Sequence, residues 1–216
     1  MVILGLTGSI AMGKSTAAAN LRRLGVPVFD ADREVHRVLG PGGAAVAPVA
    51  AAFPGMVKRG RVDRQALGGL VFKDKAALKR LERIVHPIVS RAQRRFLRRM
   101  AARREPVVVL DVPLLLEGGG ARRCDAVIVV SAPARLQAQR VLSRPGMTEA
   151  RLAGILARQM PDAEKRRRAD FVVATGLGKR ASLQRLACIV RVMRGRRGRH
   201  WPPRHVPRPR MVSRHA

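Results

Sequence analysis

The sequence predicts an α/β fold in which helices flank a parallel five-stranded sheet. Three observations lead to this prediction. Short apolar runs alternate with segments of helical periodicity, polar side chains cluster where the runs end, and a glycine-rich turn joins the first run to a helix. The expected strands are 1–6, 26–29, 107–112, 126–130 and 171–174, and the clearest helical segments between them are 133–142 and 148–160.

The first strand is the apolar run MVILGL, and the helix STAAANLRRLG follows it after a short loop, stopping at Gly25. The loop fits the pattern G-x-x-x-x-G-K-[ST], with Gly8, Gly13, Lys14 and Ser15 in the fixed places. In such a phosphate-binding loop (P-loop), glycines let backbone N–H groups surround phosphate, the lysine reaches the β- and γ-oxygens, and the serine ligates Mg²⁺.

We therefore predict an ATP site at this loop, with Lys14 acting in catalysis and Ser15 on the metal. The helix that follows adds the positive end of its dipole. The loop residues expected to bind ATP are Gly8, Ser9, Ala11, Met12, Gly13, Lys14, Ser15 and Thr16.

The second run ends in the letters FDAD, which places Asp30 and Asp32 near the γ-phosphate. In phosphoryl transfer, a carboxylate there can take the proton of an acceptor hydroxyl. Asp32 is the candidate catalytic base. The alternative is that it caps the helix REVHRVL.

The long interval 33–106 reads as a helical insertion beside the phosphate loop, where an acceptor could bind. GPGG at 40–43 breaks it, and Asp63 and Asp74 are expected helix N-caps. KAALKRLERIV has helical spacing, His86 lies between two helical segments, and an arginine-rich helix is expected from Pro87 to about 104. A lone histidine in this position is more often structural than functional.

The third strand is the first part of the stretch VVVLDVPLLLE. Asp111 stands at its end, where P-loop enzymes can carry a carboxylate that serves Mg²⁺. The other reading of this stretch is that Glu117 closes the loop that follows.

The segment 139–168 is dense in arginine and predicts a helical lid. Arg140 and Arg144 stand one helical turn apart, so both can face one anion. We expect Arg140 to act in catalysis and Arg144 to bind ATP as the lid closes. A solvated charged helix is the other reading of these arginines.

Composition limits the partners. The formal charge is +30, but 37 of the 44 basic residues are arginine, a bias that GC-rich coding also produces. Five Phe, one Trp and no Tyr are too few for a base-stacking platform, so we expect loose polyanion binding and no specific nucleic-acid partner. No apolar run reaches the ~20 residues that span a bilayer, and no cationic signal-peptide start is present. The two cysteines, Cys124 and Cys188, fit no metal or redox spacing and indicate a cytoplasmic protein.

The expected organisation is one catalytic domain, 1–190, followed by a basic, disordered tail, 191–216. Within the domain, the nucleotide core comprises 1–32 and 107–190, the acceptor-binding insertion 33–106 and the lid about 139–168. The sequence does not set the oligomeric state, and a monomer is the default.

Taken in order, GLTGSI-x-MGKST, VFDAD, LERIVHP, DVPLLLE, the arginine-rich lid and ADFVV resemble the dephospho-CoA kinase family over about residues 1–190. The resemblance implies a P-loop kinase fold and Mg²⁺-assisted transfer of phosphate from ATP to the ribose 3′-hydroxyl of dephospho-CoA, which yields coenzyme A. It places the catalytic aspartate on Asp32, and acceptor binding on His86 and Pro87.

Two departures from the family pattern stand out. Ala11 replaces a usual glycine and would strain the loop if its φ were positive. Residues 174–176, ATG, replace an asparagine-bearing turn near the adenine. Two other functions compete with the family reading. One is a small-molecule kinase of the adenylate-kinase type, and the other is a basic, nucleic-acid-associated protein that binds nucleotide without catalysis.

Overall fold

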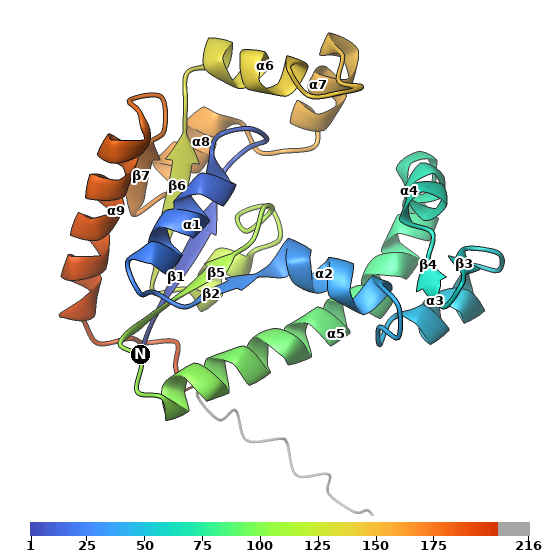
Figure 1. Cartoon of the computed structure of the whole chain (residues 1–216), viewed down its shortest axis with the longest axis horizontal. Coiled ribbons are helices and arrows are strands. Elements are labelled where there is room, and N and C mark those ends of the chain that lie inside the picture. The colour runs from blue at the N-terminus through green and yellow to red at the C-terminus, as the bar shows by residue number, and fades with distance from the viewer. Residues whose placement is uncertain (203–216) are drawn as a thin grey trace, which may run out of the picture.

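A computed structural model describes residues 1–202 and has a five-stranded parallel sheet at its centre (Figure 1). The strand order is β2-β5-β1-β6-β7. This confirms the predicted fold class, and every strand lies within two residues of its predicted bounds. The strands are β1 (Val2–Thr7), β2 (Val28–Asp30), β5 (Val107–Asp111), β6 (Ala126–Ser131) and β7 (Phe171–Ala174).

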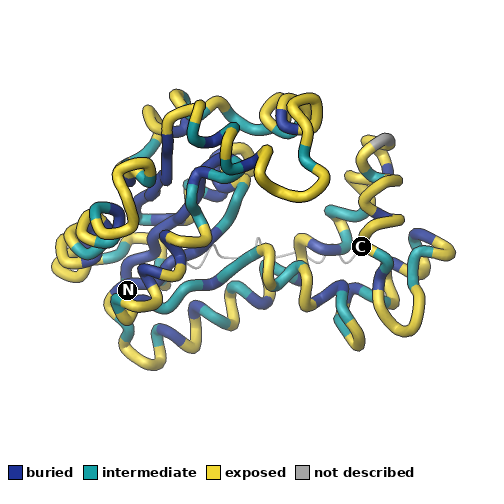
Figure 2. The backbone as a smooth tube through the Cα atoms, turned by 45° about the horizontal axis from the view of Figure 1, so that its top comes forward, coloured by how far each residue is buried: buried dark blue, intermediate teal, exposed yellow. Residues whose placement is uncertain are grey.

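Both faces of the sheet are covered by helices, and Figure 2 shows the buried strands at the centre of this half of the molecule. Val2, Leu4 and Leu6 of β1 face one side, where α1 (Lys14–Arg23) and α9 (Lys179–Arg194) pack together. Ile3 faces the other side, against the second half of α5 (Lys75–Ala102). Successive side chains of a strand alternate in this way because of its pleat.

The insertion forms a second hydrophobic core at a distance from the sheet. Val38, Val49, Phe53 and Leu67 lie at its centre. Asp63 and Asp74 cap α4 and α5 by accepting backbone N–H bonds, as the sequence predicted. The elements of the insertion before α5 are α2 (Ala31–Leu39), α3 (Val46–Ala52), β3 (Val57–Lys58), β4 (Arg61–Val62) and α4 (Arg64–Lys73).

The helix α5 is one continuous helix of 28 residues, and Pro87 lies inside it. The predicted break between two helical segments at His86 and the predicted helix start at Pro87 were therefore wrong. A proline removes one backbone hydrogen bond. Packing on both sides of Pro87 outweighs that loss, because Val85 belongs to the core of the insertion and Leu97 to the core beneath the sheet. The second half of the helix thus belongs with the sheet.

The lid consists of α6 (Ala134–Leu142) and α7 (Glu149–Leu156). The third helix of the predicted lid, α8 (Asp162–Arg167), instead packs against β6. Lys165 is fully buried there, and the Ser131 hydroxyl donates a 2.7 Å hydrogen bond to Asp162. The predicted lid therefore extended too far along the chain.

The C-terminal boundary also differs from the prediction. The helix α9 continues to Arg194, because Val190 and Met193 extend its buried stripe. Beyond it, Trp201 packs against the core beneath the sheet. Residues 191–202 are thus ordered parts of the fold, and the rest of the predicted tail, 203–216, lies outside the described residues. Within residues 1–202, no helix is both long and apolar enough to cross a membrane.

The two cysteines are not bonded to each other. Cys124 is buried beside the sheet, and burial raises the pKa of its thiol to about 12. Its thiol is therefore protonated at neutral pH and unreactive. Cys188 is exposed on α9.

Candidate active site

The phosphate-binding loop lies between β1 and α1. Close packing requires glycine at one of its positions, and a left-handed backbone conformation favours glycine at another. A Cβ on Gly8 would lie 2.4 Å from a methyl group of Val130. Gly13 has φ 89°, which glycine adopts freely, but Ala11 has φ 56° and lacks that freedom. The loop therefore holds one alanine in a left-handed conformation that costs about 1–2 kcal/mol.

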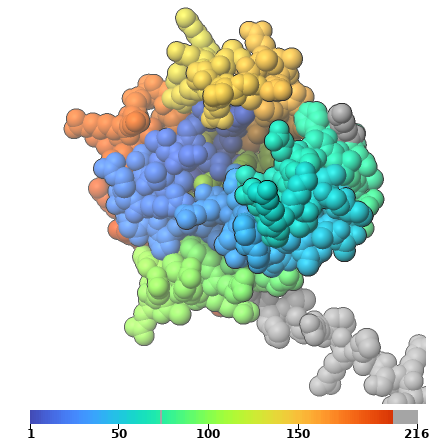
Figure 3. All heavy atoms as spheres, turned by 45° about the vertical axis from the view of Figure 1, so that its right-hand side comes forward, coloured from blue at the N-terminus to red at the C-terminus, as the bar shows by residue number. Residues whose placement is uncertain are grey.

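A cavity of about 630 Å³ opens above this loop. Figure 3 shows a hollow between the lid and the insertion, with N-terminal residues at its floor. Asp32, Arg140 and Arg144 line the cavity together with most of the predicted loop residues, so the structure brings these parts of the site together. The loop residues that line it are Gly8, Ser9, Ala11, Gly13, Lys14, Ser15 and Thr16.

Met12 does not line the cavity, in contrast to its predicted ATP-binding role. Its side chain is buried in the core next to the sheet, and its sulfur accepts a hydrogen bond from the Ala132 N–H at 3.1 Å. Its own N–H donates to the Ser9 carbonyl, so neither group faces a phosphate. An apolar side chain in this loop is more stable in the core than in a polar cavity.

Lys14 and Asp111 form an ion pair at the end of the sheet. The Lys14 ammonium lies 2.8 Å from Asp111 Oδ1, and only 3% of the Asp111 side chain is exposed. Burial raises the pKa of Asp111, and the neighbouring Lys14 opposes the rise. Asp111 therefore depends on Lys14 to stay charged in a buried position.

The oxygen donors at this place suit magnesium. Mg²⁺ prefers oxygen ligands, and it commonly uses one or two protein side chains together with phosphates and water. The Ser15 hydroxyl lines the cavity, and Asp111 is joined to the loop through Lys14. Among residues 1–202, no three His, Cys, Asp or Glu side chains converge on a metal position. A serine hydroxyl and a carboxylate match the one or two protein side chains that Mg²⁺ commonly uses beside phosphates.

The two acids of FDAD have different roles in the structure. Asp30 is the N-cap of α2, because its carboxylate accepts the Arg33 N–H at 2.9 Å. Asp32 lies in the first turn of the helix, is exposed to solvent and lines the cavity. The capping alternative therefore applies to Asp30, and Asp32 is available for chemistry.

A second cavity, of about 600 Å³, lies between α2, α5 and the loop after β5. We refer to it as the acceptor cavity. His86 lines it, whereas Pro87 does not and is exposed beside a neighbouring shallow cavity. Asp32 and Pro113 belong to the walls of both the nucleotide and the acceptor cavities. Asp32 thus lies where two bound molecules would meet.

Two residues that contact the loop, Thr175 and Gln159, were not predicted from the sequence. Arg140 donates to the Thr175 carbonyl at 3.1 Å and to the Ala11 carbonyl at 3.3 Å. The Thr175 hydroxyl donates to the Met12 carbonyl at 2.7 Å, so the turn after β7 holds the loop. Gln159 accepts the Ile10 N–H at 3.1 Å. The letters ATG and RQM contain these residues, but no pattern in them reveals contacts with a loop more than 100 residues away.

Glu117 closes the loop after β5, as the alternative reading expected. It lies 2.8 Å from the buried ammonium of Lys165 in α8 and accepts the Met160 N–H at 3.0 Å. Burial raises the pKa of Glu117, but Lys165 and the backbone donors outweigh that effect and lower it. This ion pair joins the wall of the acceptor cavity to the segment that follows the lid.

Comparisons with known proteins identify the family of this chain. The family model described as dephospho-CoA kinase matches residues 2–178. A dephospho-CoA kinase of Paramagnetospirillum magneticum is 65% identical over 197 residues, which cover 91% of this chain and 93% of that protein. One of Mesorhizobium japonicum is 54% identical over 92% of this chain and 100% of its own length.

A solved structure shows the same fold. The dephospho-CoA kinase from Campylobacter jejuni superimposes with a TM-score of 0.62 at 26% identity, covering 88% of this chain and 95% of that one. The family match and the similar relatives show that the chain belongs to the dephospho-CoA kinase family.

Proposed function

We propose that Asp32 directs the transfer of the γ-phosphoryl group of ATP to the ribose 3′-hydroxyl of dephospho-CoA. The reaction of the family yields ADP and coenzyme A and completes coenzyme A synthesis. The observation that carries the proposal is the place of Asp32 in the walls of both cavities. A direct transfer requires donor and acceptor to meet at one point, and this carboxylate lies there.

The ATP side of the site consists of positive groups and loop amides. Lys14 binds the β- and γ-oxygens once the nucleotide draws it from Asp111. Arg140 is held by carbonyl oxygens rather than by a carboxylate, so its charge is not neutralised. Arg140 and Arg144 stabilise the charge that develops on the transferring group when the lid closes.

Ser15 and Asp111 would hold Mg²⁺ with the phosphates. The ion would neutralise charge on the β- and γ-oxygens. Before nucleotide binds, the pairing of Lys14 with Asp111 holds the carboxylate ionised in its buried position.

On the acceptor side, Asp32 accepts the proton of the 3′-hydroxyl while the hydroxyl oxygen bonds to the γ-phosphorus. The bond from that phosphorus to the β-phosphate oxygen breaks, and ADP leaves. His86 lies on α5 in the wall of the same cavity and is placed to contact the nucleoside of the acceptor.

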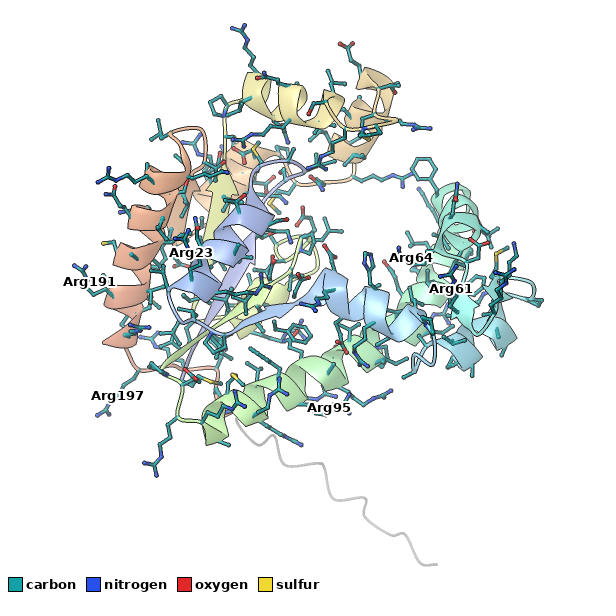
Figure 4. All side chains as sticks on the ribbon, in the orientation of Figure 1. Arg23, Arg61, Arg64, Arg95, Arg191 and Arg197 are labelled. Carbon is teal, nitrogen blue, oxygen red and sulfur yellow. The ribbon has the colours of Figure 1, made fainter. Side chains whose placement is uncertain are left out.

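The proposal needs no partner besides the two substrates. The monomer expected from the sequence stays a prediction. The arginines labelled in Figure 4 come from separate elements, among them α1, α4, α5 and α9.

The test is single-turnover phosphorylation of dephospho-CoA at saturating ATP, with Asp32→Asn compared with the wild type. Asparagine keeps the shape of the side chain but cannot accept the proton. We expect the rate to fall by on the order of 10² or more, with ATP affinity unchanged. AMP offered as acceptor should give little product, which separates this activity from that of an adenylate kinase.

Asp30→Asn is the matched control, because asparagine caps a helix about as well as aspartate. It should keep a rate close to that of the wild type. An inactive Asp30 variant together with an active Asp32 variant would show that Asp30, and not Asp32, is the base. Two active variants would contradict the mechanism.

A further inference from the structure

A third cavity, of about 570 Å³, adjoins the acceptor cavity at the far half of α5. We call it the distal cavity. Arg94 and Leu97 of α5 form one wall, and Arg123 lies near the start of β6. Arg199 and Trp201, from the segment after α9, form another part of the wall. The family match ends at residue 178, so this wall lies beyond it.

The acceptor and distal cavities share part of their walls. Ser90, Gln93 and Arg123 line both of them. His86, Ser90, Gln93 and Leu97 recur at intervals of three or four residues and therefore share one face of α5. With 1.5 Å of rise per residue, the stretch from His86 to Leu97 covers about 16 Å. A long molecule that begins at Asp32 could thus extend along the helix.

The distal cavity has the chemistry for an anion with an apolar extension. Arg94, Arg123 and Arg199 contribute three guanidinium groups, and no acidic side chain lines the cavity. Within residues 1–202, none of the three forms an ion pair. Leu97 and Trp201 add apolar surface beside these charges.

The segment that carries Arg199 and Trp201 is anchored by specific contacts. The Arg199 N–H donates to Asp125 Oδ1 at 2.5 Å, while Asp125 Oδ2 accepts the Ile3 N–H at 2.7 Å. A Cβ on Gly198 would lie 2.0 Å from the Met1 carbonyl, so only glycine fits there. The distal cavity is therefore built by long-range contacts.

We propose that the distal cavity binds the diphosphate and pantetheine arm of dephospho-CoA. Arg123 and Arg94 contact the diphosphate, Arg199 adds charge from the segment after α9, and the arm lies against Leu97 and Trp201. The inference depends on the proposed function, because it assumes that the nucleoside of the same molecule lies at Asp32. It assigns substrate binding to a segment that sequence analysis placed in a tail.

Trp201 provides a direct test, because it is the only tryptophan of the chain. The probe is 4′-phosphopantetheine, which carries a phosphate and the arm but no adenine. Titration of the full-length protein should change tryptophan emission saturably. The compound should also inhibit competitively against dephospho-CoA. Inorganic pyrophosphate at the same concentrations should bind more weakly, because it lacks the arm.

Variants on α5 test the charge contacts. Arg94→Gln should raise KM for dephospho-CoA about tenfold and leave kcat and KM for ATP unchanged. Loss of one charged contact weakens binding about tenfold. Arg95→Gln is the matched control. Arg95 is the next residue on the helix, lies at its outer edge in Figure 4 and lines none of the three cavities.

The outcomes separate this inference from the proposed function. Normal turnover with no emission change and no competition by 4′-phosphopantetheine overturns the inference alone. Equal effects of the Arg94 and Arg95 variants also overturn it. A wild type that does not phosphorylate dephospho-CoA contradicts the proposed function, and the emission titration then still decides whether the distal cavity binds the arm.

Discussion

The ammonium group of Lys14 lies 2.8 Å from a carboxylate oxygen of Asp111, with 17% of the first side chain and 3% of the second exposed to solvent. The lysine that we propose as a phosphate ligand therefore also neutralises a buried charge in the free protein. Its removal should affect folding as well as catalysis.

We expect Lys14→Ala to reduce phosphate transfer by on the order of 10² or more. The same change should lower the free energy of unfolding by about 2 kcal/mol, because it leaves Asp111 buried without a partner. Adding Asp111→Asn should restore most of the stability but none of the activity. Thermal unfolding without ligand and a coupled assay of ADP release measure the two effects.

Lys58→Ala is the control for this variant, because Lys58 forms an exposed pair with Asp63 at 3.1 Å. Its loss should cost less than about 0.5 kcal/mol. Equal losses for the Lys14 and Lys58 variants would show that the pairing with Asp111 contributes no more than a surface contact.

The pairing of Glu117 with Lys165 predicts a pH-dependent contribution to stability. The pKa of Glu117 lies below its ordinary value of 4.5, so the folded state keeps the carboxylate charged where the unfolded chain protonates it. Its stabilisation is therefore present above about pH 4.5 and lost as the pH falls. Glu117→Gln should cost about 3 kcal/mol at pH 7, and the difference from the wild type should shrink in acid.

Urea unfolding between pH 7 and pH 3.5 measures this difference. Glu164→Gln, which removes an exposed partner of Arg168 in the same helix, should cost little at any pH. Glu117→Leu combined with Lys165→Met should recover most of the stability, because an apolar pair can replace a buried ion pair. A difference between Glu117→Gln and the wild type that stays constant across the pH range would refute the assignment.

Ala11 predicts a stabilising substitution. Its φ of 56° costs about 1–2 kcal/mol for an alanine, and the greater freedom of glycine in the unfolded chain offsets part of that cost. Ala11→Gly should raise the free energy of unfolding by about 0.5 kcal/mol and lower KM for ATP. Ala19→Gly, at an exposed position inside α1, should instead destabilise by about 1 kcal/mol. Thermal unfolding that shifts in the same direction for both variants would contradict strain at Ala11.

Two truncations test the C-terminal segment. Deleting 198–216 should give a protein less stable by about 2 kcal/mol than deleting 203–216, because only the first removes the packing of Trp201 and the Arg199 contact with Asp125. Both proteins lack the arginines of 203–216, so retention on a polyanion column should fall in each. Identical melting temperatures would show that residues 198–202 do not stabilise the fold.

Local patterns were enough to predict the sheet and the phosphate-binding loop. Apolar runs such as 126–130 have few alternatives to a buried strand, and the spacing of Gly8, Gly13 and Lys14 reflects a single local geometry. Asp63 and Asp74 were likewise predictable as caps, because a cap bonds to a backbone N–H two or three residues away.

Contacts between distant segments could not be predicted in this way. Thr175 bonds to a loop residue that is 163 positions earlier in the sequence, and the lid helices separate Glu117 from Lys165 in the sequence. The same limit explains the errors at Met12 and Trp201. Each lies in a stretch without strand or helix periodicity, and its burial depends on a surface that other parts of the chain supply.

Pro87 has a mechanical consequence. It lacks an N–H, so the Arg83 carbonyl has no intrahelical partner, and bending α5 there breaks one bond fewer than elsewhere. Before this joint Val85 packs in the core of the insertion, directly after it Ile88 packs in the same core, and further along Leu97 packs in the core beneath the sheet. Flexing at the joint would swing the insertion like an arm and change the width of the acceptor cavity, and Ile88 is the core residue that would have to adjust.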